Sequence, residues 1–420
     1  MMSNIKTDQS NREYFMNIST LTLASTLALT VSAHTMATEQ SPLATRLDAA
    51  IDRALADQRI VGAVILVAQD GKLIYQRAAG MADREAATPM REDAIFRLAS
   101  VTKPIVTTAA LRLVEQGRLK LNDPVTRWLP NFRPHTADGA TPKITIHQLL
   151  THTAGLTYDF MEPAGNPYQR LGVSTGLDQP GVSLNENLRR IAAAPLSYQP
   201  GSQWRYSMSI DVLGAVVARA SGQSLPKAVH QLVTSPLGMR DTVFTVTDKQ
   251  RLTTPYGDGQ PVPQRMAVEQ TVKFHGAPIT FVPGRLFDPR AYPSGGAGMT
   301  GTAADVLKLL ETLRNEGGSL LKPNTIKQMF QAHVGPQAQT QGPGWGFGYG
   351  GAILVDPVAA TSPQSAGTMQ WGGAYGHNWF IDPAQRLTVV ALTNTTFEGM
   401  AGRFTTDIRD AIYDTQPTSH

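Results

Sequence analysis

Strand-like sequence lies near both ends of this 420-residue chain, and a long helical and proline-rich stretch separates the two parts. Residues 61–80 hold two β-rich runs divided by the turn dipeptide Asp70-Gly71, which predicts a hairpin. The simplest arrangement joins this hairpin with later strands in one antiparallel sheet, flanked by terminal helices, with the helical middle inserted as a second lobe. We therefore predict an α+β fold. Later β-like stretches lie at 344–355, 367–382 and 386–394.

This arrangement sets the expected domain boundaries. The sheet domain takes residues 38–99 and 288–415, with helices predicted at 44–57 and 400–413. The mainly helical lobe takes residues 100–287, where the joints between helices are rich in proline.

The N-terminus has a distinct apolar stretch. Residues 18–31 are uncharged and mostly apolar or small, but fewer than the about 20 residues needed to span a bilayer. Small-x-small motifs, typical of signal cleavage, follow at 31–33 and 35–37. We expect residues 1–37 to be a signal peptide or a disordered extension, and the mature protein to be periplasmic or secreted. No later segment has 18 uninterrupted apolar residues, so stable membrane insertion is not expected.

Composition excludes several classes of protein. The chain has 37 Lys and Arg against 33 Asp and Glu, with no run of five like charges, so nucleic acid is not an expected partner. It has no Cys, which excludes thiol nucleophiles, iron–sulfur clusters and disulfides. Its nine His form no H-E-x-x-H pair, so no catalytic metal is expected, and no cofactor either.

The strongest candidate for chemistry is the segment Ser100–Lys103, which opens an apolar helical run. Residues three apart lie on one face of a helix with Cβ atoms about 5–6 Å apart, so the amine can take the proton of the hydroxyl. The spacing recurs in Ser224–Lys227, which reads as a helix N-cap, and in Ser319–Lys322, which reads as a loop. On spacing alone, Ser100 could equally be an N-cap.

Two sharper-looking motifs lack the context they need. Gly172–Gly176 matches the G-x-S-x-G elbow of α/β-hydrolases, but a polar, proline-flanked loop surrounds it, so Ser174 is not expected to be catalytic. Gly296–Gly301 matches a dinucleotide-binding pattern, but no buried strand precedes it and Leu321 stands where an acidic residue belongs. The next segment, Thr302–Asp305, predicts a capping box at the start of a helix.

Five phrases in a fixed order resemble one protein family over residues 45–415. The family is the serine β-lactamase and penicillin-binding protein superfamily, and specifically its family VIII carboxylesterases. The ordered set is far more specific than any one motif. The five phrases are Phe96–Lys103, Leu149–Leu156, Tyr206–Gly214, Ser294–Met299 and Trp371–Pro383.

This resemblance implies a β-lactamase/transpeptidase-like fold and an acyl-enzyme mechanism. It implies that Ser100 is the nucleophile, that Lys103 is its proton acceptor or electrostatic partner, and that Tyr206 is a general base. It also implies that the backbone N–H groups of Ser100 and Ala374 form the oxyanion hole. Which of Lys103 and Tyr206 takes the first proton stays open at this point.

Two departures from the lactamase pattern favour esters. Trp371-Gly372-Gly373 stands where similar β-lactamases carry Lys-Thr-Gly, so the charge expected to hold a β-lactam carboxylate is missing. Met208 stands where an Asn could contact the side-chain amide of a β-lactam. An apolar acyl or alcohol group suits Trp371 better.

Other residues of the region receive more modest roles. Tyr158 and Tyr375 are expected in the substrate pocket together with Trp371 to Gly373 and Met208. His152 is expected to be a structural hydrogen-bonding group. His377 is expected to be structural or to support Tyr206 from behind.

The function predicted from these residues is a serine carboxylesterase that cleaves small-molecule esters of short-chain or small hydrophobic acids through a Ser100 acyl-enzyme. The alternatives on the same fold are a β-lactamase, a D-alanyl-D-alanine carboxypeptidase, and an amidase or acyltransferase; weak β-lactamase activity is compatible with the ester reading. A non-catalytic penicillin-recognition module is disfavoured, because Ser100, Lys103 and Tyr206 are all present. The oligomeric state is left open.

Overall fold

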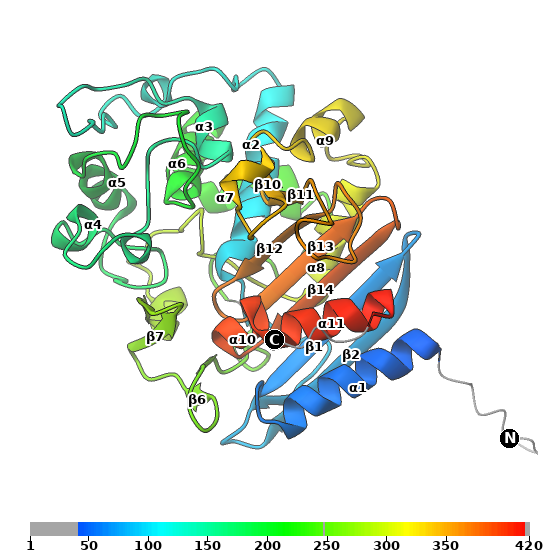
Figure 1. Ribbon diagram of the computed structural model, residues 1–420. Coiled ribbons are helices and arrows are strands. Elements are labelled where there is room, and N and C mark those ends of the chain that lie inside the picture. Colours follow the sequence, from blue (N-terminus) through cyan, green and yellow to red (C-terminus); the bar gives the residue numbers. More distant parts are fainter. Residues whose placement is uncertain (1–40, 247, 416–420) are drawn as a thin grey trace, which may run out of the picture. The chain divides into compact units, whose positions relative to one another are not determined.

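An eight-stranded antiparallel sheet joins sequence from both ends of the chain in the computed structural model, which describes residues 41–246 and 248–415 (Figure 1). Its strands are β1 (Gly62–Gln69), β2 (Lys72–Asp83), β3 (Thr88–Pro89), β10 (Trp345–Phe347), β11 (Ala352–Leu354), β12 (Met369–Gly373), β13 (His377–Asp382) and β14 (Leu387–Thr393). They follow the order β10-β11-β12-β13-β14-β1-β2-β3. The central pair sets Ala63 of β1 opposite Thr393 of β14. The predicted sheet of distant strands is therefore confirmed.

Helices cover both faces of this sheet (Figure 1). On one face lie α1 (Pro42–Ala56) and α11 (Arg403–Tyr413), and α8 (Ala303–Arg314) packs on the other. Successive side chains of β1 point to opposite faces, so Ile65 packs in the cluster of α1 and α11 and Leu66 packs in the larger cluster that includes α8. Because both faces are covered, β1 is apolar and buried along almost its whole length.

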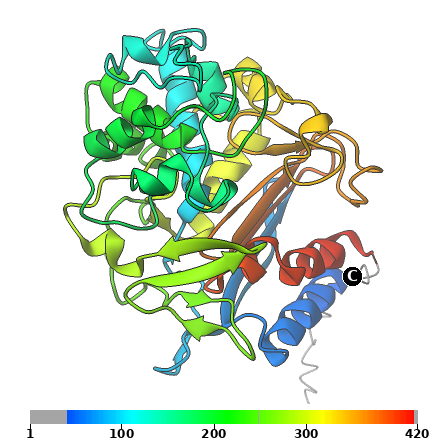
Figure 2. The same cartoon turned by 60° about the vertical axis from the view of Figure 1, so that its left-hand side comes forward.

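The middle of the chain forms helices that gather beside the sheet (Figure 2). Among them, α2 (Thr102–Glu115) and α6 (Ser209–Ser221) pack against each other in the large core cluster and are buried on most sides. Of the shorter helices, α3 (Ile146–Leu150) and α7 (Leu225–Val229) pack against α6. The middle part also holds α4 (Pro167–Arg170) and α5 (Leu184–Ala193), and α9 (Pro323–Met329) comes later in the chain.

Two hairpins interrupt the part of the chain expected to be helical and loop-like. They pair β5 (Tyr256–Gly257) with β6 (Gln264–Arg265), and β7 (Gln270–Phe274) with β8 (Ala277–Phe281). Alternation in β7 and the turn at 275–276 are hairpin signals, but they are short, and the helical interpretation overlooked them. The division of residues 38–415 into two domains stays a prediction.

The ends of the chain differ from expectation in one detail. The helix predicted at 400–413 is two helices, α10 (Thr396–Ala401) and α11, because Gly402 adopts an extended backbone that ends the first and caps the second. The predicted signal peptide, residues 1–37, lies outside the described residues. Within the described ranges, no helix is long and apolar enough to cross a membrane.

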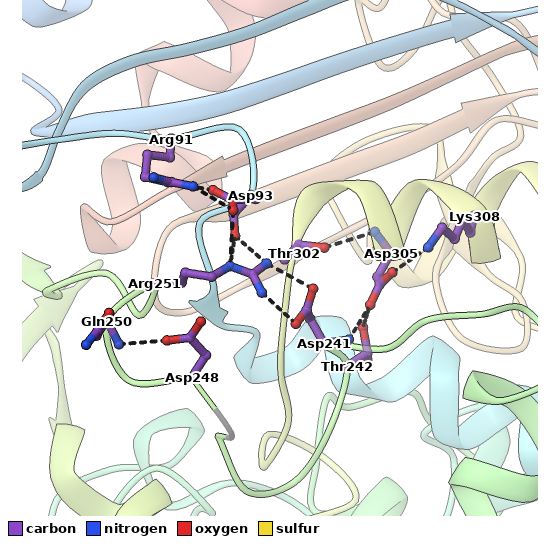
Figure 3. A network of polar contacts seen from close by, with 10 residues as sticks. All are labelled: Arg91, Asp93, Asp241, Thr242, Asp248, Gln250, Arg251, Thr302, Asp305 and Lys308. Atoms are coloured by element: carbon purple, nitrogen blue, oxygen red, sulfur yellow. Dashed lines mark hydrogen bonds and ion pairs between the residues drawn. The ribbon is translucent and has the colours of Figure 1, made fainter. Parts of the chain in front are cut away.

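A polar network ties the start of α8 to the segment that precedes the short strand β4 (Phe96–Arg97) (Figure 3). The guanidinium of Arg251 donates to both carboxylate oxygens of Asp241, at 2.9 Å each, and to the carbonyl of Asp93. The Thr302 hydroxyl accepts from the N–H of Asp305, so the predicted N-cap is confirmed. The capping box is incomplete, because the carboxylate of Asp305 instead accepts from the N–H of Asp241. This network holds the segment that leads into β4.

Candidate active site

Ser100 lies in a single turn of 3-10 helix, η1 (Ala99–Val101), between β4 and α2. β4 pairs with β9 (Thr300–Gly301), which fixes the entry to the turn. Ala99 has φ of 44°, a left-handed conformation that side chains rarely adopt and that turns the chain sharply before the serine. The following helix α2 then places Lys103 on the same side as Ser100.

Lys103 is 2% exposed, and its ammonium group has three hydrogen-bond partners. It donates to the Ser100 hydroxyl oxygen at 3.1 Å, to the Tyr158 hydroxyl at 3.1 Å and to the Gly296 carbonyl at 2.8 Å. Three acceptors match the three N–H groups of a protonated lysine, whereas a neutral amine has only two. The geometry therefore favours a charged Lys103 beside the serine.

Tyr206 reaches the same serine from the loop before α6. Its hydroxyl donates to the Ser100 hydroxyl oxygen at 2.7 Å, and the Lys103 ammonium lies 4.7 Å from the centre of its ring. Tyr158, which also contacts Lys103, is completely enclosed, and burial together with the neighbouring Tyr206 raises its pKa well above the ordinary value. Tyr158 thus stays neutral, and Tyr206 is the phenol positioned to exchange a proton with Ser100.

His152 supports the Tyr206 loop from within the core. Its Nδ1 accepts a hydrogen bond from the N–H of Ser207 at 3.2 Å, and its ring lies 5.0 Å from the ring of Tyr206. Burial, and then the charge of Lys103, hold the pKa of His152 well below its ordinary value, so the ring is neutral. A neutral imidazole with Nδ1 as acceptor fits the structural role predicted for His152.

The support for Lys103 is the feature that sequence reasoning missed. The Gly296 carbonyl belongs to a loop that Asp211 anchors, because its buried carboxylate accepts from the Ser294 hydroxyl at 2.6 Å. A Cβ at Gly296 would collide with the second carboxylate oxygen of Asp211, so only glycine allows this close approach. The signal for this loop was the glycine-rich phrase Ser294–Met299, whose glycines were interpreted only as allowing a close crossing of backbones.

The end of strand β12 lies directly against the turn that carries Ser100. A Cβ at Gly373 would come within 2.5 Å of the Leu98 carbonyl oxygen, so this approach also requires glycine. The next residue, Ala374, has an N–H without an acceptor among the described residues. The N–H of Ser100 lies within the turn η1, which is closed by a hydrogen bond from the N–H of Val101 to the Leu98 carbonyl. The two amides proposed for the oxyanion hole are thus on adjacent segments.

Trp371 forms an aromatic wall beside the serine. It is 7% exposed, and its ring centre lies 5.1 Å from that of Tyr206 and 5.3 Å from that of Phe347. Gly372 and Gly373 continue the strand past this wall toward Ala374. The surface presented next to Tyr206 is therefore apolar and carries no cation from β12.

The other predicted pocket residues lie deeper. Tyr158 is occupied with Lys103, and Met208 is completely buried in the core at the start of α6. Tyr375 packs edge-on against Phe281, with ring centres 5.0 Å apart. Contact of a substrate with these three residues stays a prediction.

Two residues that invite a catalytic reading are engaged elsewhere. Ser174 is completely buried, donates to the carboxylate of Asp178 at 2.7 Å and accepts from a backbone N–H of its own loop. The Nε2 of His377 lies 2.7 Å from the Arg97 carbonyl, so this ring supports the segment before Ser100 and not Tyr206. Within the described ranges, no cluster of three or more His, Asp or Glu is arranged to hold a metal ion.

Acid is expected to destabilise the protein through His377. Burial lowers the pKa of this ring to about 4, whereas an unfolded histidine titrates near 6.5. Between these values the unfolded chain binds more protons, so the free energy of unfolding falls as the pH is lowered, by about 2 kcal/mol at pH 5 from this residue. Calorimetry at pH 7.5 and 5.0 measures the loss. His377→Gln should show a smaller difference between the two pH values, and an unchanged difference would contradict the assignment.

The chain is similar to known proteins in both sequence and structure. A family model described as Beta-lactamase matches residues 47–412. Esterase EstB of Burkholderia gladioli is 57% identical over 381 residues, which cover 89% of this chain and 96% of that protein. The solved structure of EstCE1, a hydrolase with promiscuous acyltransferase activity, gives a TM-score of 0.87 at 50% identity over 89% of this chain and 98% of its own. Unliganded simvastatin synthase LovD of Aspergillus terreus gives 0.69 at 25% identity, over 89% and 98%.

Proposed function

Because the chain belongs to the beta-lactamase family, we propose that it hydrolyses carboxylic esters through an acyl-enzyme formed on Ser100. Family membership also confirms the predicted β-lactamase/transpeptidase-like fold. The protein is a serine hydrolase of the carboxylesterase type, like its relative EstB. One observation carries the assignment of the nucleophile: the Ser100 hydroxyl lies within hydrogen-bond distance of both Tyr206, at 2.7 Å, and Lys103, at 3.1 Å.

In the acylation step, the phenolate form of Tyr206 takes the proton of Ser100 as the serine oxygen attacks the ester carbonyl. The charged Lys103 lies against the ring of Tyr206 and stabilises the phenolate. The carbonyl oxygen becomes an oxyanion, which the N–H groups of Ser100 and Ala374 bind; losing one such donor typically costs about 3 kcal/mol. Tyr206 then returns the proton to the leaving alcohol.

Deacylation reverses these roles with water in place of the alcohol. Tyr206 takes a proton from the water, the hydroxide attacks the acyl carbon, and the oxyanion again forms at the same two N–H groups. The intermediate collapses by breaking the bond between the acyl carbon and the Ser100 oxygen, which releases the carboxylic acid, and Tyr206 returns its proton to that oxygen to restore the hydroxyl. Throughout the cycle Lys103 keeps its three hydrogen-bond partners and acts through its charge.

The substrates are small-molecule esters with a short or small hydrophobic acyl group. Trp371 presents an apolar face next to Tyr206, and the neighbouring Phe347 extends it. Burying an apolar group against such a wall lowers the free energy by about 25 cal/mol per Å² of surface removed from water.

The experiment that tests the nucleophile is covalent trapping. Diethyl p-nitrophenyl phosphate transfers a diethylphosphoryl group to an activated serine and releases p-nitrophenol. Mass spectrometry of the digested protein is expected to find this group on the peptide that contains Ser100 and not on the one that contains Ser174. Labelling at Ser174 alone, or no labelling with an ester-active protein, would refute the assignment of Ser100.

Esters are expected to be turned over far better than β-lactams. With Trp371 in place of a lysine, no cation of β12 attracts the carboxylate of a β-lactam. We expect kcat/KM for p-nitrophenyl butyrate to exceed that for nitrocefin by about 10²-fold or more, because a charge-assisted hydrogen bond is missing from the β-lactam complex. Trp371→Lys should reduce this ratio. A ratio near one in the unaltered protein would favour the β-lactamase alternative.

We also propose that the protein is exported to the periplasm. The support is the uncharged apolar stretch at residues 18–31 with the small-x-small motifs that follow it. The N-terminal sequence of protein purified from the periplasmic fraction of a bacterial host is expected to start after residue 33 or 37. Recovery of the intact N-terminus from the cytoplasm would count against export.

A further inference from the structure

A cavity of about 150 Å³ lies next to the segments that build the catalytic site. Two arginines line it, Arg97 of β4 and Arg285, together with the rings of Tyr292 and Tyr375. Arg97 stands three residues before Ser100, so the wall of the cavity that Arg97 forms continues into the turn that carries the serine. The mechanism above uses neither arginine.

The Arg97 guanidinium binds only backbone carbonyl groups. Its Nε donates to the Pro283 carbonyl at 3.0 Å and one terminal nitrogen donates to the Thr253 carbonyl at 2.8 Å. Its central carbon, Cζ, lies 5.9 Å from the ring centre of Tyr375. Burial lowers the pKa of Arg97 below the ordinary value, as expected for a cation whose charge is not offset by a carboxylate. Its second terminal nitrogen has no acceptor among the described residues.

Arg285 repeats this pattern from another side of the cavity. It is 8% exposed, its Nε donates to the Asp178 carbonyl at 3.0 Å, and one terminal nitrogen donates to the Tyr292 carbonyl at 2.9 Å. The guanidinium lies over the ring of Tyr292, 4.6 Å from its centre. Here too, the other terminal nitrogen has no acceptor within the part of the chain that the structure describes.

The carboxylates in the neighbourhood are bound to other groups. Asp178 accepts from the Ser174 hydroxyl, Asp211 accepts from the Ser294 hydroxyl, and Asp288 accepts from its exposed neighbour Arg290. Among the described residues, no Asp or Glu forms an ion pair with Arg97 or Arg285. Enclosed cations are normally paired or fully hydrogen-bonded, since leaving them unpaired costs free energy. Asp288 also lines the cavity, and its hydrogen bonds with Arg290, followed by the charge of Arg285, lower its pKa to about 2. Among the described residues that line it, the cavity therefore has two arginines with unused N–H donors against one carboxylate, which is bound to Arg290.

We propose that this cavity binds a small carboxylate with a short apolar tail. A carboxylate accepts several charge-assisted hydrogen bonds, which is what two arginines with free terminal nitrogens offer. The rings of Tyr292 and Tyr375 and the side chain of Leu177 supply apolar walls for the tail. A cavity of about 150 Å³ holds a molecule the size of benzene, so a ligand of butyrate size fits.

The position of the cavity connects its ligand to the reaction. Tyr375 follows Ala374, whose N–H is one of the two oxyanion donors, and Ala297, which also lines the cavity, follows Gly296, whose carbonyl holds Lys103. A carboxylate seated there touches the segments that hold the catalytic groups. Ester hydrolysis releases acids of this class, so the identification of the ligand as product acid rests on the proposed function, while the binding itself does not.

Binding is measured by calorimetric titration of sodium butyrate into the full-length Ser100→Ala protein, which separates binding from turnover. Butyramide, the neutral isostere, and sodium sulfate are titrated in parallel. Butyrate is expected to bind at least about tenfold more tightly than butyramide, because only the anion makes charge-assisted hydrogen bonds. Equal binding of butyrate and butyramide would overturn the proposal. Binding of sulfate without butyrate would overturn the carboxylate assignment in favour of an inorganic anion.

Variants then locate the site. Arg285→Met is expected to weaken butyrate binding at least about tenfold, whereas Arg285→Lys keeps a positive charge and retains most of it. Arg290→Met is the matched control, because Arg290 is exposed, pairs with Asp288 and does not line the cavity. Equal weakening by Arg285→Met and Arg290→Met would refute the location. If Arg285→Met does not fold, the binding of butyrate to Arg285→Lys is measured instead. If butyrate bound this variant only as weakly as butyramide binds the Ser100→Ala protein, the proposed location would equally be contradicted.

Discussion

Replacing Ser100 by alanine is expected to lower kcat/KM for p-nitrophenyl butyrate by roughly 10⁴-fold or more, with little change in thermal stability. The alanine removes the oxygen that forms the acyl-enzyme, so no covalent intermediate can form, while Lys103 and Tyr206 keep the rest of their contacts. Ser100 is only half-buried and ends no helix by a side-chain cap, which is why its hydroxyl matters little to folding. Initial rates and a melting curve measure the two effects.

Ser174→Ala is the matched control for this experiment. Its hydroxyl is buried against Asp178, so the loss of a hydrogen bond is expected to cost about 1 kcal/mol of stability and to leave kcat/KM within about threefold. Both variants remove one oxygen from a serine, and each serine lies in a sequence motif that is typical of a class of serine hydrolases. If activity survived in Ser100→Ala and disappeared in Ser174→Ala, the nucleophile would be the serine of the Gly172–Gly176 loop.

Much of the sheet could be predicted from sequence, because its strands carry local signals. The turn at Asp70-Gly71 and the continuous burial of β1 come from residues adjacent in the chain, and a strand covered on both faces is apolar throughout. The sequence also predicted that β1 shares a sheet with the late strands, but it did not predict that β14 is its partner. The short hairpin of β7 and β8 was missed, since a five-residue alternation inside a proline-rich stretch is a weak signal.

Part of the candidate site could likewise be predicted from local sequence, and part of it could not. Ser100 and Lys103 share one helical turn, so their proximity follows from spacing alone. The contact of Lys103 with the Gly296 carbonyl joins residues 193 positions apart, and no local pattern encodes it. Tyr158 was predicted as a pocket residue, and its hydrogen bond with Lys103, across 55 positions, was not foreseen. Such partners follow from how the loops pack, and packing depends on the whole core.

The roles of the two tyrosines can be separated by removing one hydroxyl at a time. Tyr206→Phe is expected to lower kcat for p-nitrophenyl butyrate by about 10³-fold with a nearly unchanged KM, because general acid–base catalysis contributes about 10²- to 10⁴-fold. The Tyr206 hydroxyl lies 2.7 Å from the Ser100 oxygen, and phenylalanine preserves its packing against Trp371. Steady-state kinetics with saturating ester separate kcat from KM.

Tyr158→Phe is the control with the same chemical change at a different distance from the reaction. Its hydroxyl contacts Lys103 and not Ser100, and burial keeps the pKa of Tyr158 well above the ordinary value, so it does not take part in proton transfer. Its loss leaves the ammonium with one acceptor fewer, which is expected to lower kcat about tenfold and stability by about 1–3 kcal/mol. If Tyr158→Phe lowered kcat more than Tyr206→Phe, the base would be Tyr158, and the protonated lysine would have to stabilise a phenolate that is closed off from water. Tyr206 is only partly buried, so a phenolate at this position keeps contact with water and does not carry the full cost of burying a charge.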